Sequence, residues 1–125
     1  MTKYSDSYSP PAPTVNIKLR NPGTLESMID VPMLLDTGSD LTLIPQKFCD
    51  VIAVEASKTQ FLQLESFDRA TSIAYYVHLD LFFLNKLFRG NFLVYDHPEG
   101  IIGRDILNKF SIVFDGPNLV WKEQK

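Results

Sequence analysis

The feature that most constrains this chain is an apolar run that ends abruptly in an acid. The hydrophobic residues 33–35 lead directly into Asp36, and the small or polar residues 37–40 follow at once. Burying a carboxylate costs free energy unless the protein uses it or provides it with partners. Small polar residues let the backbone turn tightly around such a group. This stretch therefore predicts a strand that ends in a tight loop around Asp36, and by itself it fits both an ordinary turn and a catalytic loop.

A second motif favours the catalytic loop over the ordinary turn. Residues 34–40 read Leu-Leu-Asp-Thr-Gly-Ser-Asp, and residues 101–107 read Ile-Ile-Gly-Arg-Asp-Ile-Leu. In this order and at this separation, the two motifs resemble those of the retroviral-type (retropepsin-like, clan AA) aspartic proteases. The resemblance extends from Thr14 to about Trp121 and is weaker in the middle. It implies an acid-protease β-barrel that hydrolyses peptide bonds, and the initial Met, taken as the start of a free-standing reading frame, indicates a cellular or bacterial member.

Outside the two motifs, strand-like runs alternate with turn signals along the chain. Pro32 interrupts one of these runs, and because proline cannot donate to a sheet ladder we expect a break or an edge position there. This succession favours an all-β fold, a small closed barrel with one or two short helices, over an α/β fold. The expected strands are 15–20, 28–31, 33–35, 41–44, 61–64, 73–77, 77–83, 92–95, 111–114 and 119–121, and the expected helices are 46–51 and 105–110.

The length of 125 residues corresponds to one domain. Residues 1–13 are rich in Ser, Tyr and Pro, so we expect a flexible arm there and the protease domain in residues 14–125. A docking peptide and a self-cleavage segment are alternative roles for the arm. Retroviral enzymes interlace their chain ends at the dimer interface. The long arm and the polar residues after Trp121 therefore leave open a dimer that is held differently or that forms only weakly.

Composition excludes several other classes of function. The formal net charge is −3, from 12 basic and 15 acidic residues, which is no basic footprint for a nucleic acid. Cys49 is the single cysteine, so no intrachain disulfide can form, and no Cys/His cluster has metal-ligand spacing. No segment reads as a membrane span or a signal peptide. We therefore expect a cytoplasmic protein without metal or other cofactor, and without a nucleic-acid or membrane partner.

The chemistry expected of Asp36 is that of a carboxylate pair. Two carboxyl groups that share one proton can cleave a peptide bond, one as base toward a water and the other as acid toward the carbonyl. The chain has one Asp-Thr-Gly and is too short for a two-lobed enzyme. The second acid must then come from another copy, across the two-fold axis of a homodimer.

The neighbours of Asp36 have expected roles in this arrangement. Gly38 lets the backbone approach the acids without a Cβ atom in the way, and Ser39 is placed to hydrogen-bond the Asp36 carboxylate. The resemblance implies that Thr37 braces the matching loop of the partner. We therefore expect Asp36, Thr37 and Gly38 to form the catalytic motif.

The resemblance also implies a peptide substrate that lies extended between the Asp36 loop and a flap. The two runs that flank residues 65–72 are the expected flap hairpin, although none of the six glycines falls between Gly38 and Gly90. Glycine is usual at the tip of retroviral flaps, so this flap is expected to differ in shape. The expected substrate-binding residues are Leu34, Gly38, Ser39, Asp40, Leu43, Phe67 and Ile101.

Asp40 and Arg104 are the other pair that the motifs single out. In the family that this chain resembles, the arginine of the second motif bridges the second acid of the first. A guanidinium can hold a carboxylate with two parallel hydrogen bonds. The alternative is two unrelated surface charges.

We therefore expect a homodimeric aspartic endopeptidase that acts on peptides or proteins, with Asp36 as its catalytic acid. One alternative is a non-catalytic peptide-binding or assembly module that retains the barrel. A structural β-domain with a chance Asp-Thr-Gly is a second alternative.

Overall fold

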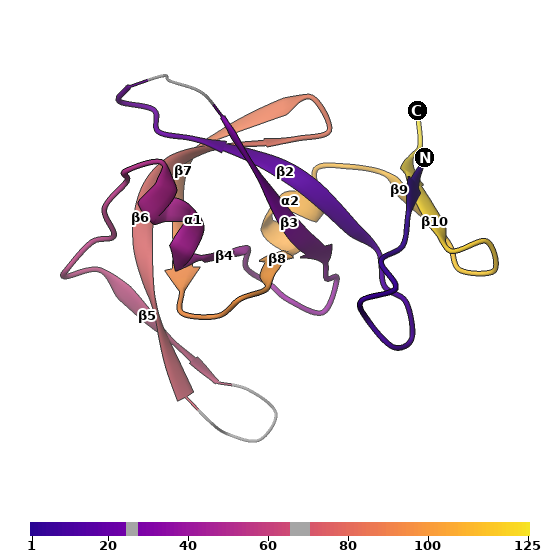
Figure 1. Cartoon of the computed structure of the whole chain (residues 1–125), viewed down its shortest axis with the longest axis horizontal. Coiled ribbons are helices and arrows are strands. Elements are labelled where there is room, and N and C mark those ends of the chain that lie inside the picture. The colour runs from indigo at the N-terminus through magenta and orange to yellow at the C-terminus, as the bar shows by residue number, and fades with distance from the viewer. Residues whose placement is uncertain (25–27, 66–70) are drawn as a thin grey trace.

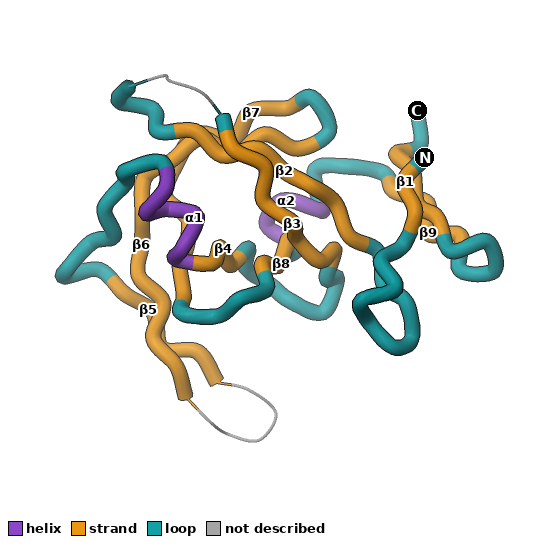
Figure 2. Tube along the Cα trace, viewed as in Figure 1, coloured by secondary structure: helices purple, strands orange, loops and turns teal. Residues whose placement is uncertain are grey.

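The computed structural model spans residues 1–125, and it describes all of them except 25–27 and 66–70. Figure 1 and Figure 2 show strands throughout the chain, with short helices between them. The elements are β1 (Thr2–Lys3), β2 (Thr14–Arg20), β3 (Ile29–Leu35), β4 (Leu43–Pro45), α1 (Gln46–Val51), β5 (Phe61–Glu65), β6 (Thr71–Phe83), β7 (Lys86–Tyr95), β8 (Gly100–Ile102), α2 (Arg104–Leu107), β9 (Ile112–Asp115) and β10 (Val120–Glu123). The expected all-β fold is confirmed.

Six strands close into a barrel in the order β2-β3-β8-β4-β7-β6, and the pairing of β2 with β6 completes the ring. The pairs β3–β8 and β4–β7 are parallel and the others are antiparallel. Closure leaves no free edge within the ring. The expected small closed barrel with short helices is therefore confirmed.

The barrel core follows from the alternation of side chains along its strands. On β6, Val77, Leu79, Leu81 and Phe83 point inward, and each is at most 2% exposed. Trp121 of β10 is also buried, at 1%, and its Nε1–H donates to the carbonyl of Thr14 (2.9 Å). This hydrogen bond joins the C-terminal strand to the start of the barrel.

The hairpin formed by β5 and the first part of β6 projects from the barrel (Figure 1). The two strands pair from Phe61↔Tyr75 to Glu65↔Thr71, and of these β6 residues only Tyr75 also pairs with β7. The expected tip residue, Phe67, lies outside the described residues. The strands that the sequence predicted on either side of the tip are present.

Pro32 lies inside β3 and does not interrupt it, so of the two expected alternatives the break is wrong and the edge position is the one that agrees with the structure. The N–H of Leu35 donates to the Pro13 carbonyl on the β2 side (3.0 Å). Alternation then directs the nitrogen of Pro32 to the opposite edge. There β8 pairs with β3 only from Met33 onward. The missing N–H of Pro32 therefore faces a position with no ladder partner.

The first residues were expected to form a flexible arm, and the structure differs at this point. Residues Thr2–Lys3 form β1, which pairs with β10 in a three-stranded sheet of order β1-β10-β9. The N–H of Tyr4 also donates to the Leu119 carbonyl (2.8 Å). Both chain ends therefore lie together at one side of the barrel (Figure 1).

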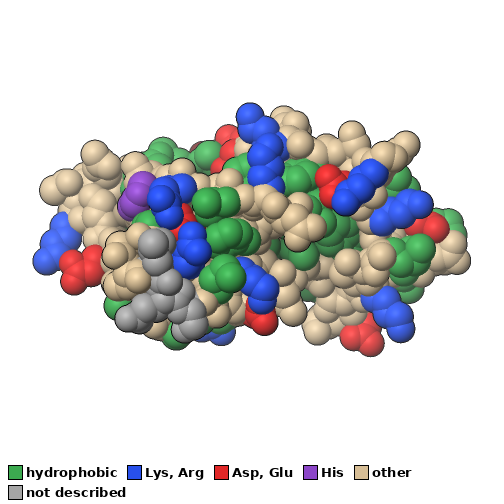
Figure 3. All heavy atoms as spheres, turned by 90° about the horizontal axis from the view of Figure 1, so that it is seen from above, with side chains coloured by type: hydrophobic (Ala, Val, Ile, Leu, Met, Phe, Trp, Pro, Cys, Tyr) green, Lys and Arg blue, Asp and Glu red, His purple; other side chains and the backbone are tan. Residues whose placement is uncertain are grey.

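Other surface and composition features are ordinary for a domain of this size. The face shown in Figure 3 carries basic and acidic side chains interspersed with hydrophobic ones. Among the described residues, no helix has the length and apolar character needed to cross a bilayer. Over the same residues, no group of three or more His, Cys, Asp or Glu side chains is placed to hold a metal ion.

Cys49 is buried on α1, and burial, with a smaller effect of Asp50, raises the pKa of its thiol to about 12.

A buried acid closes the seam between β2 and β6. Asp80 lies opposite Arg20 of β2 and Arg89 of β7 in the strand register, and its side chain is fully buried. Its carboxylate accepts hydrogen bonds from Arg20 (2.8 and 3.0 Å) and from Arg89 (2.7 and 3.0 Å). The hydrogen bonds from Arg89, and then those from Arg20, lower the pKa of Asp80 despite its burial. The ion triad therefore stabilises the barrel at the point where it closes.

We expect Asp80→Asn to lower the free energy of unfolding at pH 7 by about 2–3 kcal/mol. This is below the range of about 3–5 kcal/mol for a broken buried ion pair, because both guanidinium groups keep some contact with water. The pKa of Asp80 is lower in the folded than in the unfolded state. Its stabilisation is therefore complete above about pH 4 and is lost as the pH falls through the folded-state pKa.

Urea unfolding of wild type and Asp80→Asn from pH 7 to about pH 2 measures this difference. Asp30→Asn, which breaks the exposed pair with Lys18 (2.6 Å), is the control and should change stability by less than about 1 kcal/mol. A difference for Asp80→Asn that stays constant down to the lowest pH contradicts the assignment.

Candidate active site

Asp36 lies in a tight loop directly after β3. Its N–H donates to the carbonyl of Ile102 on β8 (3.0 Å), which fixes the start of the loop. The N–H of Gly38 donates to Oδ1 of Asp36 (2.9 Å), and the N–H of Ser39 donates to the Asp36 carbonyl (3.2 Å). A Cβ atom on residue 38 would lie 3.1 Å from Oδ1 of Asp36, so glycine permits this close approach. The backbone therefore wraps around a half-buried carboxylate.

The hydroxyl of Ser39 does not contact the Asp36 carboxylate as expected. It donates to the Leu41 carbonyl instead (2.7 Å). The physical reason is the turn itself, which directs residue 39 away from Asp36 and brings the carbonyl two residues on within reach of its hydroxyl. The N–H of Gly38 is the donor that contacts the acid.

The expected ion pair between Asp40 and Arg104 does not form within the described part of the single chain. The ion pairs that join described residues do not include it. Arg104 begins α2 beneath the loop, where its Nη1 donates to the Thr37 carbonyl (2.7 Å) and its N–H donates to the Ser39 carbonyl (2.9 Å). The guanidinium thus holds the backbone of the Asp36 loop, while Asp40 is exposed.

The sequence analysis did not predict a set of hydrogen bonds that joins the two motifs, which we call the clamp. Thr42 is 1% exposed, and Asp105 accepts hydrogen bonds from its N–H (3.1 Å) and from its hydroxyl (2.6 Å). The same hydroxyl accepts a hydrogen bond from the N–H of Gly103 (3.1 Å). A Cβ on residue 103 would come within 2.5 Å of the Leu41 backbone. The signal in the sequence was a hydroxyl residue inside the apolar run 41–44, with an acid in the second motif to pair with it.

A groove of about 640 Å³ lies between the Asp36 loop and strand β5. It contains four of the expected substrate-binding residues, Gly38, Ser39, Asp40 and Leu43. Leu34 and Ile101 are not in its lining; they lie opposite each other in the parallel pair β3–β8. The sequence analysis did not select the other lining residues, which are Leu41, Leu62, Gln63, Leu64 and Glu65.

An apolar cluster forms the floor beneath this groove. Its buried members are Leu43, Ala74, Leu93 and Tyr95. Side chains of the loop, the hairpin and β8 pack against them, and these are Leu41, Leu62, Leu64, Tyr76 and Ile101. Ile101 therefore supports the groove from below, although it does not line it.

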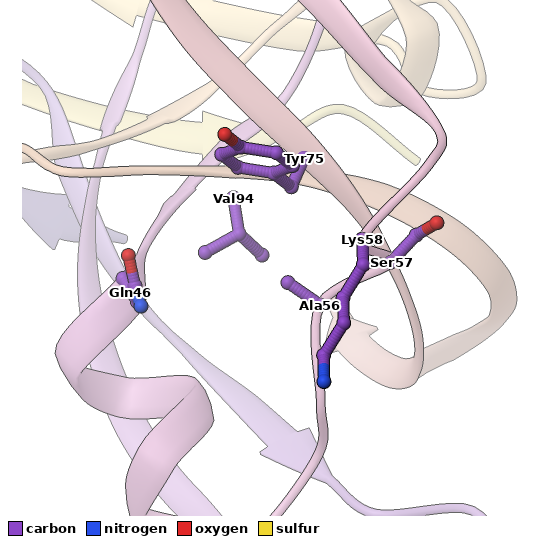
Figure 4. A pocket seen from close by; sticks show the side chains of 6 residues that line it. All are labelled: Gln46, Ala56, Ser57, Lys58, Tyr75 and Val94. Carbon is purple, nitrogen blue, oxygen red and sulfur yellow. The ribbon is translucent and has the colours of Figure 1, made fainter.

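A second hollow, of about 330 Å³, lies at the root of the hairpin, between α1, the segment before β5, and strands β6 and β7 (Figure 4). Its lining residues are Gln46, Ala56, Ser57, Lys58, Tyr75 and Val94. It shares no lining residue with the groove beside Asp36 and contains no carboxylate. It is therefore a separate feature of the hairpin base.

The two histidines lie outside the groove lining. His78 is exposed on β6 and lies 3.2 Å from the side-chain oxygen of Asn91 through its Nδ1. His97 stacks on Tyr95 and accepts a hydrogen bond from the N–H of Glu99 (3.1 Å). The Tyr95 hydroxyl donates to the Glu99 carbonyl, so these residues brace the loop between β7 and β8.

We expect Thr42→Val to lower the free energy of unfolding by about 1–3 kcal/mol. The change keeps the shape of the side chain but removes a buried hydroxyl, so that Gly103 loses its acceptor and Asp105 loses a donor. Urea denaturation measures the loss, and the exposed Thr59→Val is the matched control. Equal stability of the two variants would contradict the role of the clamp.

Comparison with known proteins places this arrangement in a family. A search of curated proteins finds no match. Among solved structures, the chain is similar to EIAV protease in complex with the inhibitor HBY-793, with a TM-score of 0.63 and 20% identity over 78% of this chain and 86% of that one. The family model described as "Retroviral aspartyl protease" matches residues 9–114, which include both motifs. The chain therefore belongs to the retroviral aspartyl protease family.

Proposed function

We propose that this protein is an aspartic endopeptidase whose active site forms when two copies bring their Asp36 carboxylates together. The observation that carries the proposal is the position of Asp36: a half-buried carboxylate, held by the Gly38 N–H, in a loop that borders a groove. Each chain supplies one such acid. A homodimer with its two-fold axis between the two loops supplies the pair.

In this mechanism the two Asp36 groups share one proton, since two carboxylates a few ångströms apart do not both ionise. The charged one takes a proton from a water as that water attacks the scissile carbonyl. The neutral one donates its proton to the carbonyl oxygen, which gives a tetrahedral diol. The acid that took the proton of the water then donates it to the amide nitrogen while the other acid takes a proton from the diol, so that the C–N bond breaks and an amine and a carboxylic acid are released. The N–H of Gly38 donates to one oxygen of the carboxylate and fixes its orientation. Arg104, which binds the Thr37 carbonyl, keeps the loop in position during the reaction.

The groove suits an extended peptide. In the described part of the chain, β5 pairs on one side only, with β6, so its other edge can pair with a substrate strand. The aliphatic side chains Leu41, Leu43, Leu62 and Leu64 lie along the same groove. These contacts favour substrates with apolar side chains near the cleaved bond. Gly38 and Asp40 are placed for polar contacts with the peptide.

A non-catalytic module that binds peptides through the same groove is the second candidate. One observation favours it: none of the six glycines lies between Gly38 and Gly90, so the hairpin lacks the glycines expected at the tip of a flap. Such a module would use the groove and would not need the Asp36 carboxylate. Binding without cleavage distinguishes it from the enzyme.

We expect the wild-type protein to cleave a diverse peptide mixture at acidic pH, and Asp36→Asn to lower the rate by about a thousandfold. The amide cannot act as base toward the water, and acid–base catalysis supplies acceleration of this order. Mass spectrometry of the mixture after incubation from about pH 4 to pH 7 detects the cleavage and its side-chain preference.

Asp50→Asn, an equivalent change on the exposed face of α1, is the matched control and should cleave as wild type does. Circular dichroism shows whether each variant is folded. Equal cleavage by wild type and Asp36→Asn would exclude this mechanism. Peptide binding without cleavage by a dimeric wild type would support the non-catalytic module.

A further inference from the structure

The hollow at the root of the hairpin lies where β6 leaves the barrel. Tyr75 pairs with Phe61 of β5 and with Val94 of β7, so it belongs to both strand pairs. The segment before β5 is attached at the same place, because the N–H of Ser57 donates to the Tyr76 carbonyl (2.7 Å). The hollow therefore has one wall on the barrel and another on the segment that leads into the hairpin.

The hollow and the groove beside Asp36 lie on opposite faces of the ribbon that β6 and β7 form here. Side chains alternate between the two faces of a strand. Ala74 and Tyr76 contribute to the apolar floor of the groove, whereas Tyr75 between them lines the hollow. On β7, Leu93 contributes to the floor and Val94 lines the hollow. A molecule in the hollow therefore contacts the ribbon beneath the groove without occupying the groove.

The size and the apolar walls of the hollow suit a small flat molecule. Its volume of about 330 Å³ lies at the lower end of the range of about 300–1,000 Å³ that is usual for ligand sites. The Tyr75 ring, Val94 and Ala56 form the apolar walls (Figure 4). The Tyr75 ring also contacts the ring of Phe61, at a centroid distance of 6.2 Å, which supports its position. A flat apolar group can therefore stack on Tyr75.

The polar side chains of the hollow favour a ligand with a negative charge. The Lys58 side chain runs down one side of the hollow (Figure 4), and the ion pairs among described residues do not include it. The described lining contains no carboxylate. The Ser57 hydroxyl is already used, since it accepts hydrogen bonds from the N–H groups of Thr59 (3.2 Å) and Gln60 (2.9 Å). Lys58 and the amide of Gln46 are then the polar side chains of the lining that remain to bind a ligand.

We propose that this hollow is a second binding site, for a small organic anion that joins a carboxylate to a flat apolar body. The carboxylate contacts Lys58, and the apolar body stacks on Tyr75 and packs against Val94. The bound anion joins the barrel to the segment that leads into the hairpin, so it holds the hairpin against the barrel. Because β5 of this hairpin lines the groove, the anion acts on the groove from outside. The site goes beyond the proposed function, since it needs neither Asp36 nor a second chain.

The test titrates the isotopically labelled full-length protein with cinnamate, a phenyl ring joined to a carboxylate by a planar linker, and follows the amide signals by NMR. We expect saturable shifts at the residues that line the hollow. Cinnamyl alcohol keeps the ring and lacks the charge, so it should bind about tenfold more weakly, an effect of the size that a hydrogen bond between charged groups contributes.

Two variants separate the charge from the ring. Lys58→Gln should weaken cinnamate binding about tenfold, so that cinnamate and the alcohol bind alike. Tyr75→Thr keeps a side chain that suits a strand and removes the ring, so it should weaken the binding of both compounds. Lys47→Gln is the matched control and should bind as wild type does, because Lys47 lies outside the lining, with its ammonium over the Phe48 ring (5.0 Å).

Three results would overturn the site. The first is equal affinity of the wild-type protein for cinnamate and for the alcohol. The second is wild-type affinity of Lys58→Gln for cinnamate. The third is the lack of saturable shifts at the lining of the hollow, including the case in which the shifts fall on the groove beside Asp36 instead.

Hydrogen exchange tests the effect on the hairpin. Cinnamate at roughly ten times its Kd should slow the exchange of the amides that join β5 to β6 by about tenfold, since a ligand that binds only the closed hairpin lowers the open population in that proportion. The amides that join β9 to β10 should exchange as before. Unchanged exchange of the hairpin amides while the hollow is occupied would overturn the proposal.

The two measurements are made without substrate. A failure here therefore rejects the binding site alone, and a failure of the Asp36→Asn comparison rejects the proposed enzyme alone.

Discussion

The contact on which the rest of this structure depends is the clamp between Thr42 and Asp105. It joins the segment after the Asp36 loop to the start of α2, and the hydroxyl of Thr42 extends the contact to the Gly103 backbone. Arg104, between these two residues, then reaches the loop carbonyls of Thr37 and Ser39. This polar network, in which Thr42 is buried and Arg104 and Asp105 are exposed, sets the position of the acid relative to the barrel. Each side chain in the network has a partner, so the network favours a single arrangement of the loop.

The Asp36 loop, α2 and β9 are neighbours in space. The clamp holds the segment after the loop against the start of α2. The cavity that Thr37 shares with α2 and β9 shows how close the catalytic motif lies to the chain ends. In the enzyme proposed above, each chain contributes one Asp36, so a single chain carries half of the proposed acid pair.

Much of this fold could be predicted from local pattern. Alternation of apolar and polar residues identified β2 and β6, and the proline before residue 46 marked the start of α1. Residues 1–13 differed from expectation, and for Pro32 the sequence left a break and an edge position open, because both depend on which neighbours a strand has. Pro32 fits inside β3 since β8 does not reach it. Thr2–Lys3 are ordered since β10, more than a hundred residues away in sequence, provides their pairing.

The sequence by itself determined the class of the fold and the identity of the candidate acid. An apolar run, an acid and a glycine are adjacent in the chain, and local rules suffice to recognise them. The tertiary structure decided the partners of the polar side chains around that acid. Ser39 and Arg104 could each reach more than one acceptor, and the choice depended on the path of the loop and on where α2 begins. Thr42 and Asp105, like Asp80 and Arg20, meet only because distant parts of the chain come together in the barrel, and no local pattern encodes the distance between residues that far apart. Arg89 reaches Asp80 locally, across the β6–β7 hairpin.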